Sequence, residues 1–303
     1  NGSDTWIVIY NLLNASEEKV INSPAIDLDP VFSTDGKLLY YGSAKLGTFD
    51  IWQYSLTSDK DSLLFEAPGI QLKPQPHPNG NQLIYLYKRG SNEIRSRQIL
   101  PNDNNNFVSL TDSTHKILIS ERNMSMIRPA LSPSGELIVY NWPTQEHYEL
   151  RLLNMDDPSS TVFLTFSEGL PLTPAWSPDS KWIYFSEANN DEVFSLKRIS
   201  SFGGTVETIE ISEWDWGEPT TRLIINTKEK GSNKLTASRL TVKDKNGHFV
   251  IPDKTQSRFD GQNGKVFFYS SGRIELTVPL GEIEIMAVKG LTTPISSKKV
   301  NLT

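Results

Sequence analysis

Cysteine is absent from this chain of 303 residues, and histidine is scarce at four residues. Without thiols, neither disulfide bonds nor cysteine chemistry contributes to its fold or function. No apolar run approaches the roughly 18 residues that a membrane-spanning helix needs. The formal net charge of -6 is mild and argues against the concentrated basic face that binds nucleic acid. We therefore expect neither a membrane span nor a nucleic-acid partner.

Motifs that carry catalysis are also missing. The histidines, His77, His115, His147 and His248, are scattered along the chain, with none of the HxH or HExxH spacing that zinc hydrolases use. The chain has no GxSxG nucleophile elbow and no phosphate-binding loop. We interpret His77 as a turn residue that bonds nearby backbone, and His147 as part of a solvated loop. The sequence thus predicts no catalytic residue, no metal site and no cofactor.

What the chain does contain is one motif in four copies. The copies read PVFSTDGKLLYY, PQPHPNGNQLIY, PALSPSGELIVY and PAWSPDSKWIYF, and they begin at Pro30, Pro74, Pro129 and Pro174. Each has serine or histidine three residues after the proline, glycine or serine after six, and tyrosine or phenylalanine after eleven. Self-similarity at a spacing of roughly 45 to 55 residues is the signature of a repeat architecture.

Each copy translates into strands. Proline is tolerated at the first residue of a strand, where no ladder donor is needed. Ser-Pro-x-Gly is a tight turn, because proline fixes φ and glycine accepts positive φ, and the aromatic run after it suits a half-buried strand. Third strands are expected near the acid–apolar pairs that begin at Asp50, Glu93, Glu149 and Glu192. With a weaker fourth strand before the next proline, each unit describes one propeller blade.

These units resemble the WD40-like (PD40) repeat of TolB-type β-propellers, whose signature is similar to P-x-φ-S-P-D-G-x-x-φ-x-F. Residues 174–185 and 129–140 match it best, whereas His77 and Asn79 depart from it. The first residues, NGSDTWIVIYNL, look like the third strand of another blade. We therefore predict a propeller over residues 1–216, with four recognisable blades and a partial one, in a natural chain that starts earlier. A missing propeller segment, the C-terminal part or a partner chain is expected to cover the open edge.

Residues 217–303 change character, and the whole chain is expected to be all-β. Candidate strands are 222–226, 238–243, 265–269, 273–278 and 282–288, separated by turn-forming residues. The last two alternate apolar and polar residues, which predicts an antiparallel hairpin with one buried face. Five or more such strands favour a small, Ig-like β-sandwich. The stretch SGRIELTVPLGEIEIMAVKG, residues 271–290, resembles the end of transthyretin-like, carboxypeptidase-regulatory-type sandwiches. The longer pattern from Gly217 to Gly290 is more specific. It resembles the β-domain that joins TolB-like propellers to metal-dependent hydrolases of the amidohydrolase or PHP type, although no hydrolase domain is present in this sequence.

One column of the repeat is a candidate binding site. The residue before each motif proline is Asp29, Lys73, Arg128 or Thr173. Because the first strand of each blade lines the channel of a propeller, these four side chains are expected to ring one channel mouth, where they suit a polar ligand or a peptide. The alternative is plain surface charge with some mutual pairing.

Aromatic residues form a second group of candidates. Trp142, Trp214, Trp216 and Phe268 are possible interface residues, because aromatic side chains anchor partners and stack on sugars. The alternative is packing of domain against domain, above all for Trp214 and Trp216 at the junction. In the run from Phe267 to Tyr269, the period of a strand places Phe268 on the face opposite its two neighbours.

These observations favour a non-catalytic binding module. Its propeller would recognise a protein, peptide or polysaccharide, and its sandwich would dock the complex to a neighbour. The main alternative is the substrate-guiding region of a larger hydrolase whose catalytic domain lies outside this chain. A propeller enzyme acting on glycans needs a carboxylate pair, and the channel column offers only Asp29. The lack of cysteine suits a periplasmic or secreted bacterial protein, whose signal peptide is not in this chain.

Overall fold

The computed structural model describes residues 5–14, 16–101, 107–109, 115–122, 128–144, 148–167, 169–188, 194–210, 212, 217–252, 257–260 and 265–303. All elements in these ranges are β-strands, as the sequence predicts. They form two compact units, Asp4–Glu210 and Ile211–Thr303. A search of the same ranges found no helix with the length and apolarity needed to cross a membrane.

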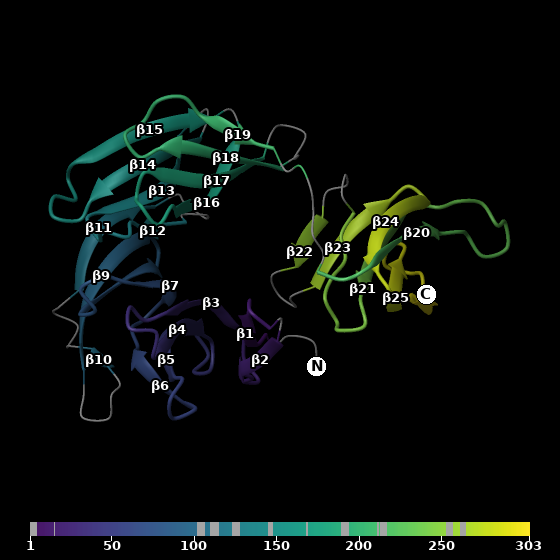
Figure 1. The fold of residues 1–303 in the computed structure, drawn as a ribbon, viewed down its shortest axis with the longest axis horizontal. Coiled ribbons are helices and arrows are strands. Elements are labelled where there is room, and N and C mark those ends of the chain that lie inside the picture. Colours follow the sequence, from purple (N-terminus) through teal and green to yellow (C-terminus); the bar gives the residue numbers. More distant parts are fainter. Residues whose placement is uncertain are drawn as a thin grey trace. The chain divides into compact units, whose positions relative to one another are not determined.

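The first unit consists of antiparallel sheets that follow one another in chain order around an arc (Figure 1). A two-stranded sheet comes first, β1 (Ile7–Asn11) with β2 (Ser16–Ile21). The first full blade is β3 (Asp27–Phe32), β4 (Leu38–Ser43), β5 (Asp50–Ser55) and β6 (Lys60–Phe65). The second is β7 (Ile70–Pro76), β8 (Gln82–Lys88), β9 (Asn92–Pro101) and β11 (His115–Glu121), with β10 (Phe107–Ser109) on the end of β9.

Two more blades complete the unit. The third is β12 (Ala130–Leu131), β13 (Leu137–Pro143), β14 (Tyr148–Asn154) and β15 (Thr161–Ser167). The fourth is β16 (Leu170–Trp176), β17 (Trp182–Ala188), β18 (Phe194–Ser200) and β19 (Glu207–Ile209). The prediction of four blades and a partial one is thereby confirmed. The acid–apolar pair at Glu192, which was expected to open a third strand, lies outside the described residues.

The hydrophobic core of this unit lies between its sheets, because alternate residues of a strand face opposite neighbours. In β4, Leu38 and Tyr40 pack toward the second blade, and Leu39 and Tyr41 pack toward the β1–β2 sheet. The same packing explains why the last residue of each motif copy is aromatic. Its four aromatic residues, Tyr41, Tyr85, Tyr140 and Phe185, are each at most 1% exposed.

The motif turns adopt the geometry that their residues predict. The residue six positions after the proline has positive φ in every copy. These residues are Gly36, Gly80, Gly135 and Ser180. The amide of each donates to the carbonyl three residues earlier at 2.9 to 3.0 Å. The turn therefore fixes the relation between the first and second strands of every blade.

The second unit contains two sheets that share one core. The smaller pairs β20 (Thr220–Asn226) with β24 (Arg273–Pro279). The larger runs β22 (Ser257–Asp260), β23 (Lys265–Ser270), β21 (Ser238–Lys243), β25 (Gly281–Val288) and β26 (Ser296–Leu302). Ile225, Leu276 and Val278 from the smaller sheet pack with Leu240, Phe268 and Ile283 from the larger one, as in a β-sandwich.

The predicted hairpin of residues 273–278 with 282–288 is wrong. β24 pairs with β20, whereas β25 pairs with β21 and β26. The short link through Leu280 and Gly281, where φ is +116°, carries the chain from one sheet to the other. The alternation that suggested a hairpin is real, but it arises because each strand turns its apolar face to the shared core.

Candidate functional site: the axial pocket of the first unit

The inner strands of three blades carry the same irregularity. Their register shifts between Leu28 and Val31 in β3, between Leu72 and Gln75 in β7, and between Leu172 and Ala175 in β16. A bulge of this kind bends a strand and changes the direction of its side chains. It places the residue before the motif proline at a special backbone position in each of the three blades.

That backbone position is strained. Asp29, Lys73 and Thr173 have φ values of 53°, 53° and 47°, although a residue before proline prefers extended backbone. Positive φ is a clear outlier for a β-branched residue such as Thr173. Strained residues of this kind cost about 1–3 kcal/mol each and cluster at functional sites, so their recurrence at one repeat position points to a site there.

The structure brings all four residues of the predicted column together. They line one pocket of about 270 Å³, whose other walls are formed by the motif prolines with Val31 and Gln75. The lining residues are Asp29, Pro30, Val31, Lys73, Pro74, Gln75, Arg128, Pro129, Thr173 and Pro174. We call this hollow, which receives residues from all four full blades, the axial pocket.

Among the described residues, one ion pair joins charges of the axial pocket. The ammonium of Lys73 donates to Asp29 Oδ1 at 2.9 Å, which links the second blade to the first. Burial lowers the pKa of Lys73, and the nearby charge of Arg128 lowers it further, while Asp29 acts in the opposite direction. The same charges act on Lys88, at the end of β8. Burial and the charges of Arg128 and Lys73 all lower the pKa of Lys88.

Side-chain contacts between inner strands hold the pocket walls in place. The amide of Gln75 donates to the carbonyl of Pro129 at 2.5 Å and accepts from the amide of Leu131 at 2.6 Å, which ties the second blade to the third. The indole of Trp176 donates to the carbonyl of Ala130 at 2.9 Å, which ties the fourth blade to the third. The walls are thus pre-organised rather than assembled by a ligand.

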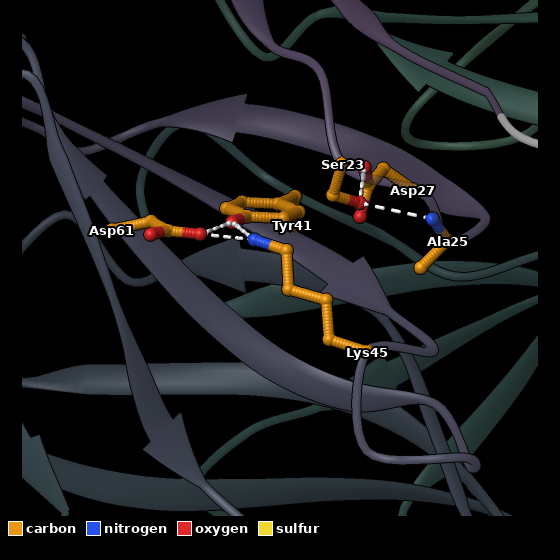
Figure 2. Close-up of polar contacts among 6 residues, drawn as sticks. All are labelled: Ser23, Ala25, Asp27, Tyr41, Lys45 and Asp61. Atoms are coloured by element: carbon orange, nitrogen blue, oxygen red, sulfur yellow. Dashed lines mark hydrogen bonds and ion pairs between the residues drawn. The ribbon is translucent and has the colours of Figure 1, made fainter.

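A second polar cluster lies on the first blade (Figure 2). The hydroxyl of Tyr41 donates to Asp61 Oδ2 at 3.0 Å, and the ammonium of Lys45 contacts both groups. Burial and the charge of Asp61 raise the pKa of Tyr41 far above its usual value, so its hydroxyl keeps its proton and does not act as a base. Burial acts to raise the pKa of Asp61, but bonds from Lys45 and Tyr41 bring it below its usual value. We interpret this cluster as structural.

The histidines lie apart where the structure describes them. His77 Nδ1 accepts from the amide of Asn79 at 3.2 Å, and Nε2 lies 3.1 Å from the carbonyl oxygen of Gly135 in the turn of the next blade. It is thus a turn residue, although one of its bonds reaches a neighbouring blade. His115 is in β11, His248 pairs with Asp244 at 3.2 Å, and His147 lies outside the described residues. Within the described ranges, no three His, Cys, Asp or Glu side chains are grouped as a metal site.

The predicted interface aromatics have different environments. Trp142 is half-buried against the core between the second and third blades, edge-on to Tyr140 at 5.9 Å. Phe268 is 1% exposed in the core of the second unit, which corrects its assignment as an interface residue. Its neighbour Tyr269 is exposed instead, because the strand places it on the opposite face. Trp214 and Trp216 lie outside the described residues.

Tyr269 borders a hollow of about 540 Å³ on the second unit, together with Arg239, Leu291 and Ile295. Leu291 and Ile295 are both exposed. The hollow itself was not predicted from the sequence.

Two residues of the axial pocket region were not predicted from the sequence. Lys88 lies on a second strand and belongs to no repeated column, so nothing in the motif indicates that the charge of Arg128 acts on it. Gln75 follows its motif proline directly, but the corresponding residues of the other copies are Val31, Ala130 and Ala175. Its bridging role depends on the distance between two blades, which the repeat does not encode.

Comparison with known proteins agrees with this fold. No family model matches the chain. An uncharacterized protein of Agrobacterium fabrum is 24% identical over 214 residues, which cover 69% of this chain and 67% of that protein. The structure of a putative TolB from Agrobacterium tumefaciens is similar with a TM-score of 0.58 at 16% identity, covering 98% of this chain and 89% of that one.

The structure of TolB from Acinetobacter baumannii is similar with a TM-score of 0.55 at 14% identity, covering 90% of this chain but only 62% of that one. The chain therefore spans less than two thirds of that TolB. At these identities the likeness establishes the fold, a TolB-like β-propeller, and leaves function to be argued from the site.

Proposed function

We propose that this chain is a binding module that recognises a protein or polymer partner at the axial pocket and does not itself turn over substrate. The observation that carries the proposal is the convergence of Asp29, Lys73, Arg128 and Thr173, each from a different blade, on one pocket. Three of them have strained backbone. Strain that recurs at one repeat position, in a pocket whose walls are braced from blade to blade, is typical of a recognition site.

The second unit is proposed to dock this complex to a neighbouring domain or chain. Its exposed Tyr269, Leu291 and Ile295 around one hollow support that role, since clustered exposed apolar residues mark interaction surfaces. Its kinship with transthyretin-like sandwiches, its association with amidohydrolase or PHP-type hydrolases and a periplasmic or secreted setting remain predictions from the sequence.

Site-specific crosslinking tests the recognition role. A photo-reactive amino acid at position 173 is expected to crosslink a partner from an extract of the source organism, whereas the same group at Val162, an exposed residue on the outermost strand of the third blade, is not. Lys73→Ala and Arg128→Ala are expected to weaken capture about tenfold, as loss of a charge-assisted contact does, without unfolding the chain.

The opposite pattern would contradict the proposal. If the partner crosslinks only through Val162, and both alanine variants capture it as well as the parent chain does, recognition takes place on the outer rim and the axial pocket has another role.

A further inference from the structure

The axial pocket region carries more positive than negative charge. Two cationic side chains, Lys73 and Arg128, and one carboxylate, Asp29, line the pocket itself. The charge of Arg128 also acts on Lys88, at the end of β8. Lys73 already holds Asp29 at 2.9 Å. In the part of the chain that the structure describes, the guanidinium of Arg128 is paired with no carboxylate, although its backbone amide donates to Asn141.

This excess of positive charge has an energetic cost, because Lys73 and Arg128 line the same pocket and the side chain of Lys73 is largely buried. Burial and mutual repulsion lower the pKa of both lysines, and Asp29 offsets only part of that effect. A second negative group in the pocket would relieve the repulsion and give Arg128 the bidentate acceptor that a guanidinium prefers. The chemistry of the walls therefore selects an anion.

The size and lining of the pocket indicate what kind of anion it can hold. A volume of about 270 Å³ is below the roughly 300 Å³ at which pockets begin to hold drug-sized ligands, so it suits one side chain. The four motif prolines and Val31 supply apolar walls, and none of the lining residues is aromatic. Sugar rings bind best against aromatic faces, whereas a short aliphatic stem ending in a carboxylate fits walls of proline.

Building on the proposed function, we propose that the axial pocket binds a side-chain carboxylate, from glutamate or aspartate, on an acidic segment of a partner protein. Arg128 is the principal ligand of this carboxylate. Lys88 and Lys73 contribute the surrounding positive potential, and Asp29 orients Lys73. The prolines contact the aliphatic stem of the side chain.

Fluorescence anisotropy with labelled peptides tests this assignment on the full chain. The probes are a short peptide of glutamates and its glutamine counterpart, both acetylated and amidated so that side chains alone differ. At an ionic strength of about 0.02 M, where screening is weak, the glutamate peptide is expected to bind at least about tenfold more tightly than the glutamine peptide. Arg128→Gln should remove most of that difference, whereas Lys181→Gln, at an exposed turn of the same unit, should preserve it.

Each alternative result has its own meaning. Equal binding of both peptides, or an Arg128→Gln variant that still prefers the glutamate peptide, overturns the carboxylate assignment. If a partner still crosslinks through position 173 in that case, the recognition role stands and only its chemistry is wrong; if that crosslink is lost as well, both proposals fail. An oligouronate that displaces the glutamate peptide and binds more tightly would identify an acidic polysaccharide, which contradicts the peptide assignment.

Discussion

Three successive blades open their third strand with a buried acid, and these acids have different partners. Glu93 accepts from Arg95 at 2.6 Å, and Glu149 accepts from Arg151 at 2.7 Å, each from the residue two positions later on the same face. In the first blade the acid is Asp50, and Trp52 stands where the arginine would be. Asp50 is 0% exposed, and no described cation pairs with it. Its burial and the charge of Glu66 raise its pKa to about 6, an effect that the amide of Ala67 offsets only in part.

Asp50 therefore makes stability depend on pH in an unusual direction. The pKa of its carboxyl is higher in the folded chain than the ordinary value of 3.8, so the folded state binds more protons between these two values. The free energy of unfolding consequently falls as pH rises from about 4 to about 6. We expect Asp50→Asn to raise the free energy of unfolding more at pH 7 than at pH 4, with a difference of up to about 3 kcal/mol. Urea denaturation at both pH values measures this difference.

Asp35→Asn is a matched control, whose effect on stability should depend on pH in the opposite direction. Bonds from Ser33 and Lys37 lower the pKa of Asp35, so its contribution to stability is present at neutral pH and lost in acid. Asp35→Asn should therefore be more harmful at pH 7 than at pH 4. An effect of Asp50→Asn that is the same at both pH values would show that folding does not raise the pKa of Asp50.

At the scale of elements, the motif turn is the part that local sequence determines most completely. Its serine accepts from the amide five residues later in three copies, at 2.9 to 3.1 Å. In the second copy His77 replaces that serine, and its ring reaches the turn of the next blade. The space for this ring depends on Gly135, because a Cβ there would overlap the imidazole and lie 2.9 Å from Pro78 Cδ.

We expect Gly135→Ala to be more destabilising than Gly36→Ala. Both glycines have positive φ, at 80° and 70°, and strain alone costs about 1–2 kcal/mol. Nothing lies within 4 Å of a Cβ at Gly36, whereas at Gly135 overpacking adds about 1–3 kcal/mol. Combining Gly135→Ala with His77→Ser should lower its cost in urea denaturation toward that of Gly36→Ala, with a remainder from the contact with Pro78. Equal costs for the two single variants would contradict the contact between turns.

Features of the fold that depend on residues close together in the sequence could be predicted, whereas contacts between distant strands could not. The blades could be predicted because proline, turn and alternating strand occur within twelve residues of each motif copy. The pocket column could be predicted because a repeat places equivalent residues at equivalent positions around one axis. The pairing of β24 with β20 could not, since alternation shows that a strand has a buried face but not which strand lies beside it. The electrostatic effect of Arg128 on Lys88 likewise acts between blades and could not be predicted from the motif.

At the scale of the whole molecule, the repeat brings residues that are far apart in the sequence close together in space. Asp29 and Thr173 are far apart in the chain and belong to the first and last full blades, yet both line the axial pocket. No blade alone forms this site, because each contributes one residue before its proline and the cores between blades set their spacing. Recognition at the axial pocket is therefore a property of the assembled unit, and it should be lost whenever the blades separate.

Hydrogen–deuterium exchange of the full chain, with and without the partner captured from the source organism, tests this account most directly. Binding at the axial pocket predicts slower exchange in the inner segments of all four blades, at residues 27–32, 70–76, 128–131 and 170–176. Slower exchange confined to the outermost strands β6, β15 and β19, with the inner segments unchanged, would contradict it.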